Sequence, residues 1–233
     1  MTKKKTGLQN GFELMLADVI VPGIIHNFAN PLNGIVGRAR LLKRKIDEQM
    51  KSVEDFRNQD FCRMTSNDVG LICQEADRLS GLLLVISEKF YALNNMFPQK
   101  INLSRLLEME VKFFDFNLDF KHNVQKNIRL DADLPEIRAV AAELSFCLSS
   151  IFQNIISRTL AGDRKELHLT SSFRDGIIEV EFKWAGPVRK SAFKNFTGYP
   201  AIVAVFEKYG VGFSQSQDGE FHVLNLTAPV AQE

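Results

Sequence analysis

Residues 23–35 read GIIHNFANPLNGI, and they lie within an apolar pattern that decides the first half of the fold. The apolar positions of this pattern are spaced alternately four and three residues apart: Val21, Ile25, Phe28, Leu32, Ile35, Ala39, Leu42 and Ile46. A second series alternates in the same way: Val69, Ile72, Ala76, Leu79, Leu83, Ile86, Phe90 and Leu93. Steps that average about 3.5 residues are typical of the seam of a supercoiled bundle. The pattern therefore predicts two long helices, joined by a polar turn within residues 47–67.

Two helices cannot bury two such seams well by themselves, whereas four helices can. We therefore expect a homodimer in which the hairpins of two chains form a four-helix bundle. A bundle within one chain, using helices from the second half, is the alternative.

The pattern changes at residues 96–100, MFPQK, where the proline ends the second helix. We place a domain boundary here, between a helical hairpin over 1–96 and a second domain over 97–233. Strands are predicted over 101–103, 124–130, 137–140, 167–173, 177–182, 211–216 and 221–226. Helices are predicted over 104–117, with Ser104 as N-cap, 141–160 and 199–209. This order predicts an α+β fold, in which the hairpin is followed by a small α/β sandwich with helices on one face of a mixed sheet.

Composition excludes some classes of function. The formal net charge of 233 residues is +1, so bulk electrostatics gives no indication of a nucleic-acid partner. No apolar run approaches the roughly 18 residues of a membrane span, so we expect a cytoplasmic protein. The cysteines Cys62, Cys73 and Cys147 lie far apart, which suits a reducing compartment and argues against a zinc site or a disulfide framework.

The chemistry is predicted to centre on His26. This residue directly follows seam position Ile25, so its ring can reach solvent beside the seam. Pro31 interrupts the helical pattern and removes the N–H that would bond the carbonyl of Asn27. Such a break costs about 3 kcal/mol in an ordinary helix interior, which indicates a working site. Asn30 lies one turn after His26, where its amide could position a water or a phosphoryl oxygen.

This stretch resembles the phosphoacceptor helix of bacterial sensor histidine kinases. The motif of that family is a histidine, usually an acidic residue, two variable positions and Asn-Pro-Leu; residues 26–32 here read HNFANPL. Residues 75–79, EADRL, are similar to the family's start of the second hairpin helix. The resemblance implies that His26 carries a phosphoryl group and passes it to an aspartate of a response-regulator receiver domain, with Asn27 and Asn30 as catalytic neighbours. Asn27 departs from the family, because it replaces the acidic residue that helps the histidine attack ATP.

The second domain resembles the family's ATP-binding domain in outline, but the residues that the family uses are missing. In the helix that normally holds magnesium, only Asn154 remains of an asparagine pair, and Ser150 takes the other place. Trp184 replaces the aspartate that binds adenine, and it offers no acceptor to the adenine amino group. Val188 replaces a glycine of the same box, and the eight residues between it and Thr197 are too few for a flexible lid.

The phosphate-binding stretch is also degenerate, because only Gly198 is kept within 197–203 and Pro200 has no N–H to donate. We therefore expect no ATP binding. No cofactor or metal is expected in this chain, Asn154 being a remnant, and magnesium would come with the receiver partner.

The resulting prediction is a dimeric histidine phosphotransferase of a two-component phosphorelay, which exchanges a phosphoryl group between His26 and receiver aspartates without ATP. One alternative is an ATP-dependent histidine kinase fragment that lacks its sensor. Another is a non-catalytic pseudokinase adaptor or inhibitor. The basic cluster of residues 38–45 is predicted either to border a docking surface for an acidic receiver or to be a solvated face. His122, His168 and His222 are expected to be ordinary strand or surface residues.

Overall fold

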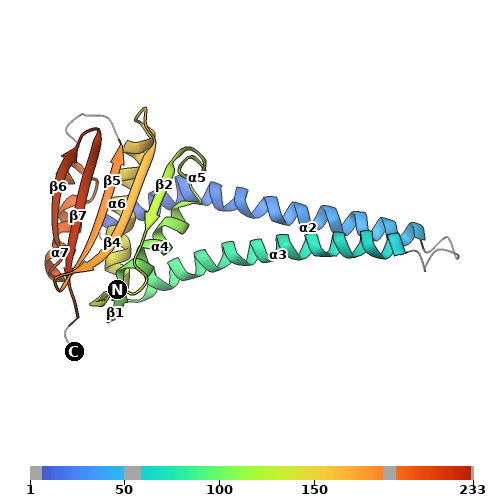
Figure 1. The fold of residues 1–233 in the computed structure, drawn as a ribbon, viewed down its shortest axis with the longest axis horizontal. Helices are drawn as coiled ribbons and strands as arrows, with labels where there is room; N and C mark the ends of the chain where they lie inside the picture. The colour runs from blue at the N-terminus through green and yellow to red at the C-terminus, as the bar shows by residue number, and fades with distance from the viewer. Residues whose placement is uncertain (1–6, 50–58, 186–192, 232–233) are drawn as a thin grey trace. The chain divides into compact units, whose positions relative to one another are not determined.

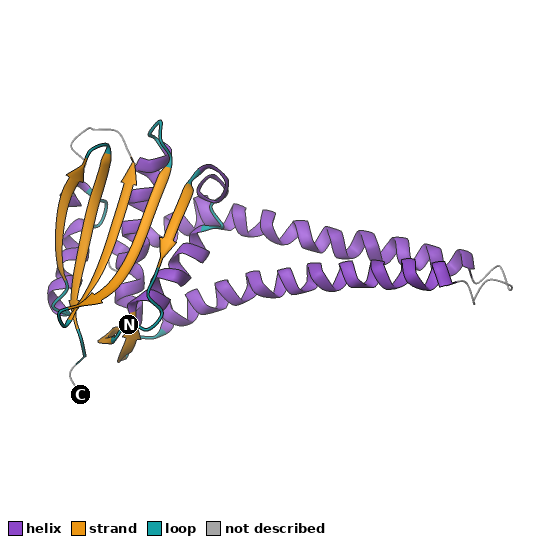
Figure 2. Cartoon of the chain, viewed as in Figure 1, coloured by secondary structure: helices purple, strands orange, loops and turns teal. Residues whose placement is uncertain are grey.

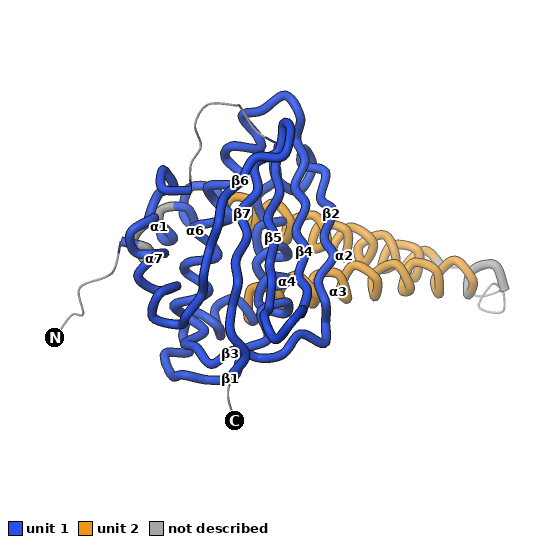
Figure 3. Tube along the Cα trace, turned by 60° about the vertical axis from the view of Figure 1, so that its left-hand side comes forward, with its two compact units in different colours: residues 1–21, 88–233 blue, residues 22–87 orange. Residues whose placement is uncertain are grey.

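The computed structural model describes residues 7–49, 59–185 and 193–231. Their contacts divide the chain into two compact units (Figure 3). Residues 22–87 form the hairpin unit, and the residues up to 21 together with those from 88 onward form the α/β unit.

The hairpin unit consists of two long helices, as the 3.5-residue spacing predicts. They are α2 (Val21–Gln49) and α3 (Gln59–Asn94). The last two turns of α3, from Glu88 onward, belong to the α/β unit. The helices meet at Gly34, where a Cβ would lie 3.3 Å from the Cγ of Glu75, and at an ion pair of Lys45 with Asp68, 2.5 Å from Nζ to Oδ2. Part of the polar stretch extends α3, since this helix begins at Gln59, and residues 50–58 lie outside the described residues.

Each predicted seam is divided into a half-buried and an exposed half. The half-buried members on α2 are Phe28, Ile35 and Leu42, and those on α3 are Ile72, Leu79 and Ile86. The exposed members are Val21, Ile25, Leu32, Ala39 and Ile46 on α2, with Val69, Ala76, Leu83 and Phe90 on α3, where Leu93 is buried. Exposed and half-buried positions thus alternate from Ile25 to Ile46 and from Val69 to Phe90, and among the described residues the exposed positions form an uncovered apolar stripe along the hairpin.

The α/β unit contains a five-stranded sheet in the order β2-β4-β5-β7-β6 and a two-stranded antiparallel pair, β1 and β3. Its elements are α1 (Gly7–Met15), the π-helical segment η1 (Leu16–Ile20), β1 (Pro98–Asn102), α4 (Leu103–Phe114), α5 (Leu118–Asn123), β2 (Gln125–Arg129), β3 (Glu136–Val140), α6 (Ala141–Leu160), β4 (Glu166–Arg174), β5 (Ile177–Ala185), the 3-10 turn η2 (Phe193–Asn195), α7 (Tyr199–Lys208), β6 (Gly212–Asp218) and β7 (Phe221–Pro229). Strands β2 and β4 are parallel, and the other neighbours are antiparallel (Figure 1).

The helices cover one face of the five-stranded sheet, as Figure 2 shows, and the α+β prediction is confirmed. Strand β5 illustrates the reason, because Ile178, Val180 and Phe182 are buried while alternate residues face away from the core. Opposite them lies α6, whose Phe152 ring is 5.5 Å from that of Phe182. The two predicted hairpins form, and at the first of them Asp175 adopts φ 50°, next to a glycine at φ 80°.

The prediction that Ser104 caps a helix over 104–117 is wrong in two respects. The cap is Asn102, whose Oδ1 accepts from the N–H of Arg105 at 3.0 Å, while Ser104 is buried within the helix with its Oγ 2.7 Å from that of Ser171. The helix also ends at Phe114, and Asn117 caps the separate α5. Both asparagines satisfy N–H groups that have no partner inside the helix.

The compact units divide the chain elsewhere than at the predicted boundary of residue 96. In α3, Lys89, Ala92 and Leu93 are buried within the α/β unit. Before the hairpin, Phe12 and Met15 are buried in the same unit. Both ends of the sequence-defined hairpin therefore contribute to the core of the α/β unit.

One helical stretch runs against the expectation that no apolar segment is long enough to span a membrane. Gly11–Glu48 contains a window with mean hydropathy 1.4, 29% of it buried, which could cross a membrane by length and composition alone. A core helix and a signal sequence meet the same criterion. Cytoplasmic localisation without a membrane span therefore stays a prediction.

Candidate functional site

The structure brings two of the predicted site residues together on α2. His26 is exposed, and Asn30, one turn later, places its Nδ2 3.4 Å from the Nε2 of His26. This is a long contact, and which ring nitrogen carries the proton decides whether Nε2 accepts from the amide. The side chains thus share one accessible face of the helix, where an incoming group can reach both.

Asn27 lies in a different environment from His26. Its side chain is only 3% exposed, and its Nδ2 donates to the carbonyl oxygen of Gly23 at 2.7 Å. Successive helix residues point about 100° apart, so burial of Asn27 is compatible with exposure of its neighbour. Its amide stabilises the local backbone, and the predicted catalytic role of Asn27 stays a prediction.

Pro31 lies inside α2 and does not end it, because the helix continues to Gln49. The proline is buried, whereas its neighbour Leu32 is 50% exposed. The interruption that the sequence predicts next to His26 is therefore accommodated within one continuous helix.

Much of the charge in the basic cluster is balanced locally. Lys43 and Arg44 pair with Asp47 and Glu48, at 2.6 and 3.8 Å, and Lys45 pairs with a carboxylate of α3. In the described part of the chain, Arg38 and Arg40 form no ion pair.

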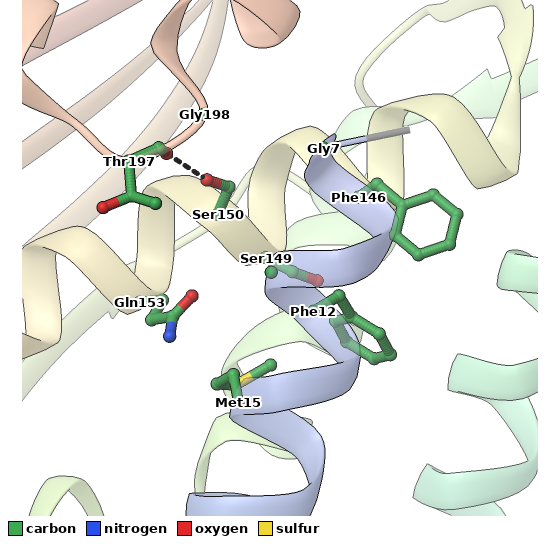
Figure 4. Close-up of a pocket in the computed structure, with 10 residues that line it drawn as sticks. Gly7, Phe12, Met15, Phe146, Ser149, Ser150, Gln153, Thr197 and Gly198 are labelled. Carbon is green, nitrogen blue, oxygen red and sulfur yellow. Dashed lines mark hydrogen bonds between the residues drawn. The ribbon is translucent and has the colours of Figure 1, made fainter. Parts of the chain in front are cut away.

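In the α/β unit, the remnant Asn154 is occupied by contacts within the protein. Its Oδ1 accepts from the N–H of Thr197 at 2.9 Å, and its Nδ2 donates to the carbonyl oxygen of Ser150 at 2.7 Å. Ser150 in turn donates to the carbonyl oxygen of Thr197 at 2.7 Å, the bond drawn in Figure 4. Arg158 also donates to the Oδ1 of Asn154, at 3.1 Å. The polar groups of this helix therefore hold the segment before α7.

The start of α7 explains the presence of Gly198 and Pro200 in this segment. Gly198 adopts φ 83°, a left-handed conformation that favours glycine, and it precedes α7. Pro200 follows in the first turn of α7, where an N–H would have no helical partner. Both residues are thus accounted for by the start of the helix.

Trp184, the residue predicted to replace an adenine-binding aspartate, lies in the core of the α/β unit. Its side chain is fully buried, with ring centroids 5.6 Å from His222 and 6.1 Å from Phe196. Its Nε1 has no hydrogen-bond partner within the described residues. His222 is itself buried and packs against the tryptophan, a role that no sequence pattern indicated. Val188 and its neighbours Gly186 and Pro187 lie outside the described residues.

A buried polar cluster in the α/β unit was not foreseen. The Nζ of Lys89, on α3, lies 2.5 Å from Glu110 Oε1, 2.7 Å from Ser145 Oγ and 2.6 Å from Ser149 Oγ. Burial lowers the pKa of Lys89, and Glu110 opposes this shift. In the sequence Lys89 is one polar residue beside an apolar seam, so the pattern carries no signal of its burial.

Within the described residues, potential metal ligands do not cluster. Across residues 7–49, 59–185 and 193–231, no group of three or more His, Cys, Asp or Glu side chains is placed to hold a metal ion.

No protein-family model and no curated protein matches this chain. Among solved structures it is similar to histidine kinase AdeS of Acinetobacter baumannii, at 13% identity over 86% of this chain and 98% of that one, with a TM-score of 0.48. The nucleotide-free catalytic domain of histidine kinase ThkA matches at 17% identity over 57% of this chain and 96% of that one, with a TM-score of 0.49.

ThkA in complex with the response regulator TrrA matches at 16% identity over 96% of this chain and 64% of that one, with a TM-score of 0.48. The structures named here thus all contain a histidine kinase or its catalytic domain. At these identities and TM-scores the likenesses assign no activity to this chain.

Proposed function

We propose that this chain is a dimeric histidine phosphotransferase of a two-component phosphorelay. The observation that carries the proposal is the exposed His26 on a hairpin helix with a heptad seam, with Asn30 one turn later and Pro31 directly after Asn30. An accessible imidazole next to an amide is suited to accept and release a phosphoryl group.

The chemistry asks little of the protein. A neutral imidazole has one ring nitrogen with a lone pair, which attacks the phosphorus of a receiver aspartyl phosphate. The new N–P bond forms as the P–O bond to the aspartate breaks, and the aspartate leaves as a carboxylate. The reverse step returns the phosphoryl group to a receiver. In this proposal the Nδ2 of Asn30, which lies 3.4 Å from the Nε2 of His26, donates to an oxygen of the phosphoryl group, and magnesium would be held by the receiver.

An ATP-independent reaction is supported by the interior of the α/β unit. Trp184, which stands in place of the adenine-binding aspartate in the resemblance, is fully buried against Phe196 and His222 and offers no acceptor to adenine. The amide of Asn154 is engaged by Thr197 and Ser150, so binding a magnesium ion there would break hydrogen bonds within the protein.

A homodimer is supported by the exposed seam halves. Ile25 and Leu32 are 63% and 50% exposed, and Leu83 on the other helix is 48% exposed. These residues lie at bundle positions that a second hairpin would cover. A receiver domain is proposed as the partner because, in the proposed reaction, its aspartyl phosphate is the phosphoryl donor to His26. We place the protein in the cytoplasm, where such receivers act.

The experiment is phosphotransfer from purified receiver domains that carry radiolabelled phosphate. Wild type should become labelled by at least one receiver, and His26→Ala should not, with His26→Gln as a second variant that keeps a polar side chain. Absence of transfer to wild type across the organism's receivers would overturn the proposal.

A parallel incubation with γ-labelled ATP separates the alternatives. Labelling of His26 by ATP would favour an ATP-dependent kinase fragment. If His26→Ala keeps in vivo signalling while a seam variant abolishes it, the chain acts as an adaptor or inhibitor.

A further inference from the structure

We infer that α1 is a built-in ligand of the α/β unit: it occupies a crevice between α6 and the Thr197–Gly198 segment, and it can be released. The crevice lies on the side of α6 that Ser149 and Ser150 line (Figure 4). Its occupancy by a segment of the same chain excludes other ligands while α1 is docked.

Two anchors hold α1 in place. Phe12 and Met15 of this helix are 6% and 3% exposed. The ring of Phe12 lies 5.6 Å from that of Phe146 on α6, edge to face, and 6.2 Å from that of Phe113 on α4. The Nζ of Lys89 lies 5.2 Å from the centroid of the Phe12 ring. Phe12 therefore covers the ammonium group of the buried polar cluster.

The docked helix nearly fills the crevice. A cavity of only about 20 Å³ remains, far below the range of roughly 300–1,000 Å³ typical of small-molecule sites. This space is lined by residues of both sides: Gly7, Gly11, Phe12, Met15, Phe146, Ser149, Ser150, Gln153, Thr197 and Gly198. With α1 removed, the same wall would present both apolar rings and polar groups to solvent.

The sequence of α1 makes it easy to release. Gly7 and Gly11 lower its helix propensity, yet a Cβ at either position would meet no atom within 4 Å. Packing therefore does not require these glycines, and α1 depends on its docking contacts to stay helical. The π-helical segment Leu16–Ile20 follows directly, a local geometry that is less regular than an α-helix.

Release of α1 would reach the candidate site through the chain itself. The segment η1 continues into α2, and His26 follows six residues after Ile20. Docking thus tethers the start of the phosphoacceptor helix to the α/β unit. This consequence for His26 rests on the proposed function, whereas the docking of α1 does not.

The test is amide hydrogen exchange of the full chain, with two variants that act in opposite directions. Phe12→Asp removes an anchor and places a charge against α6, so exchange within residues 7–20 should accelerate at least tenfold. Gly11→Ala adds a methyl group in open space, and the same amides should exchange about fivefold more slowly. Exchange in β4 and β5 should not change in either variant.

A synthetic peptide of residues 7–20 provides a second measurement. Added to Phe12→Asp, it should restore the protection of α6 amides around Ser149, and a Phe12→Asp version of the peptide should not. The inference is overturned if residues 7–20 exchange equally fast in wild type and Phe12→Asp, if β4 and β5 lose protection along with α1, or if the peptide has no effect.

Phosphotransfer to the same variants distinguishes the two proposals. Suppose hydrogen exchange of residues 7–20 responds to the substitutions as expected, but neither the wild-type protein nor any variant accepts a phosphoryl group. The docking of α1 then stands, and the proposed function fails. If the wild-type protein accepts a phosphoryl group but hydrogen exchange of residues 7–20 does not respond to Phe12→Asp, the proposed function stands and the docking of α1 fails.

Discussion

Lys89 of α3 and Glu110 of α4 form an ion pair in which neither side chain is exposed, with Nζ 2.5 Å from Oε1. Ser145 donates to Glu110 Oε1 at 2.8 Å and Ser149 to Oε2 at 3.0 Å, so both carboxylate oxygens are satisfied. Burying a charge is tolerated only when its partners are present, so each member of this pair depends on the other.

This dependence predicts a double-mutant cycle. Lys89→Met or Glu110→Leu alone should each destabilise the fold by about 3–5 kcal/mol, because an unpaired buried charge remains. The double variant should recover most of the loss, since no charge is then buried. Urea unfolding followed by circular dichroism measures all four proteins. Additive losses in the double variant would contradict the interpretation.

The exposed seam predicts which leucines hold a dimer together. Leu32 belongs to the exposed half of the seam at 50% exposure, whereas Leu41, at 46%, lies outside both halves. We expect Leu32→Glu to dissociate the dimer and Leu41→Glu, the matched control, to leave it intact. Sedimentation equilibrium gives the mass. A wild-type chain that is monomeric at tens of micromolar would refute the four-helix bundle.

The two asparagines next to His26 are predicted to have separable roles. Asn30→Ala should slow phosphotransfer at least tenfold with little effect on the unfolding midpoint, because its side chain is exposed. Asn27→Ala should instead cost about 0.5–1.5 kcal/mol of stability, since it removes a buried hydrogen bond to Gly23. Rapid-quench kinetics and thermal unfolding of both variants measure these effects. If both variants lose the same amount of phosphotransfer rate and of stability, the roles of Asn27 and Asn30 are not separable.

Thiol reactivity should follow burial. Burial raises the pKa of Cys147 to about 12, with a contribution from Glu143, whereas Cys73 is exposed. The thiolate is the reactive form, so at pH 8 only about one part in ten thousand of Cys147 would be reactive. Iodoacetamide should therefore modify Cys73 long before Cys147. Peptide mass spectrometry reads the order, and prior modification of Cys147 would indicate that α6 opens to solvent.

The regular elements could be read from the sequence because their patterns are local. Seam spacing predicted α2 and α3, and the Asp175-Gly176 pair predicted the β4–β5 turn that Asp175 forms at φ 50°. Helix α6 spans Ala141–Leu160, the range predicted from its apolar pattern. His26 and Asn30 were likewise identified as neighbours, since residues four apart share a helix face.

Other features depend on contacts between residues far apart in sequence. Asn102, rather than Ser104, caps α4, because Ser104 faces Ser171 in the core and is not available to the helix end. The short α1 was not predicted, since its two glycines weaken the local signal and its stability comes from Phe12 against α6.

The sequence by itself thus determined the long helices, the class of the sheet and the accessible histidine, each through a repeat or motif of neighbouring residues. Only the tertiary structure decided which polar groups are buried. The charge of Lys89 is held among α3, α4 and α6, and Trp184 is enclosed by Phe196 and His222. Burial is a property of all elements packed together, and no local pattern encodes it.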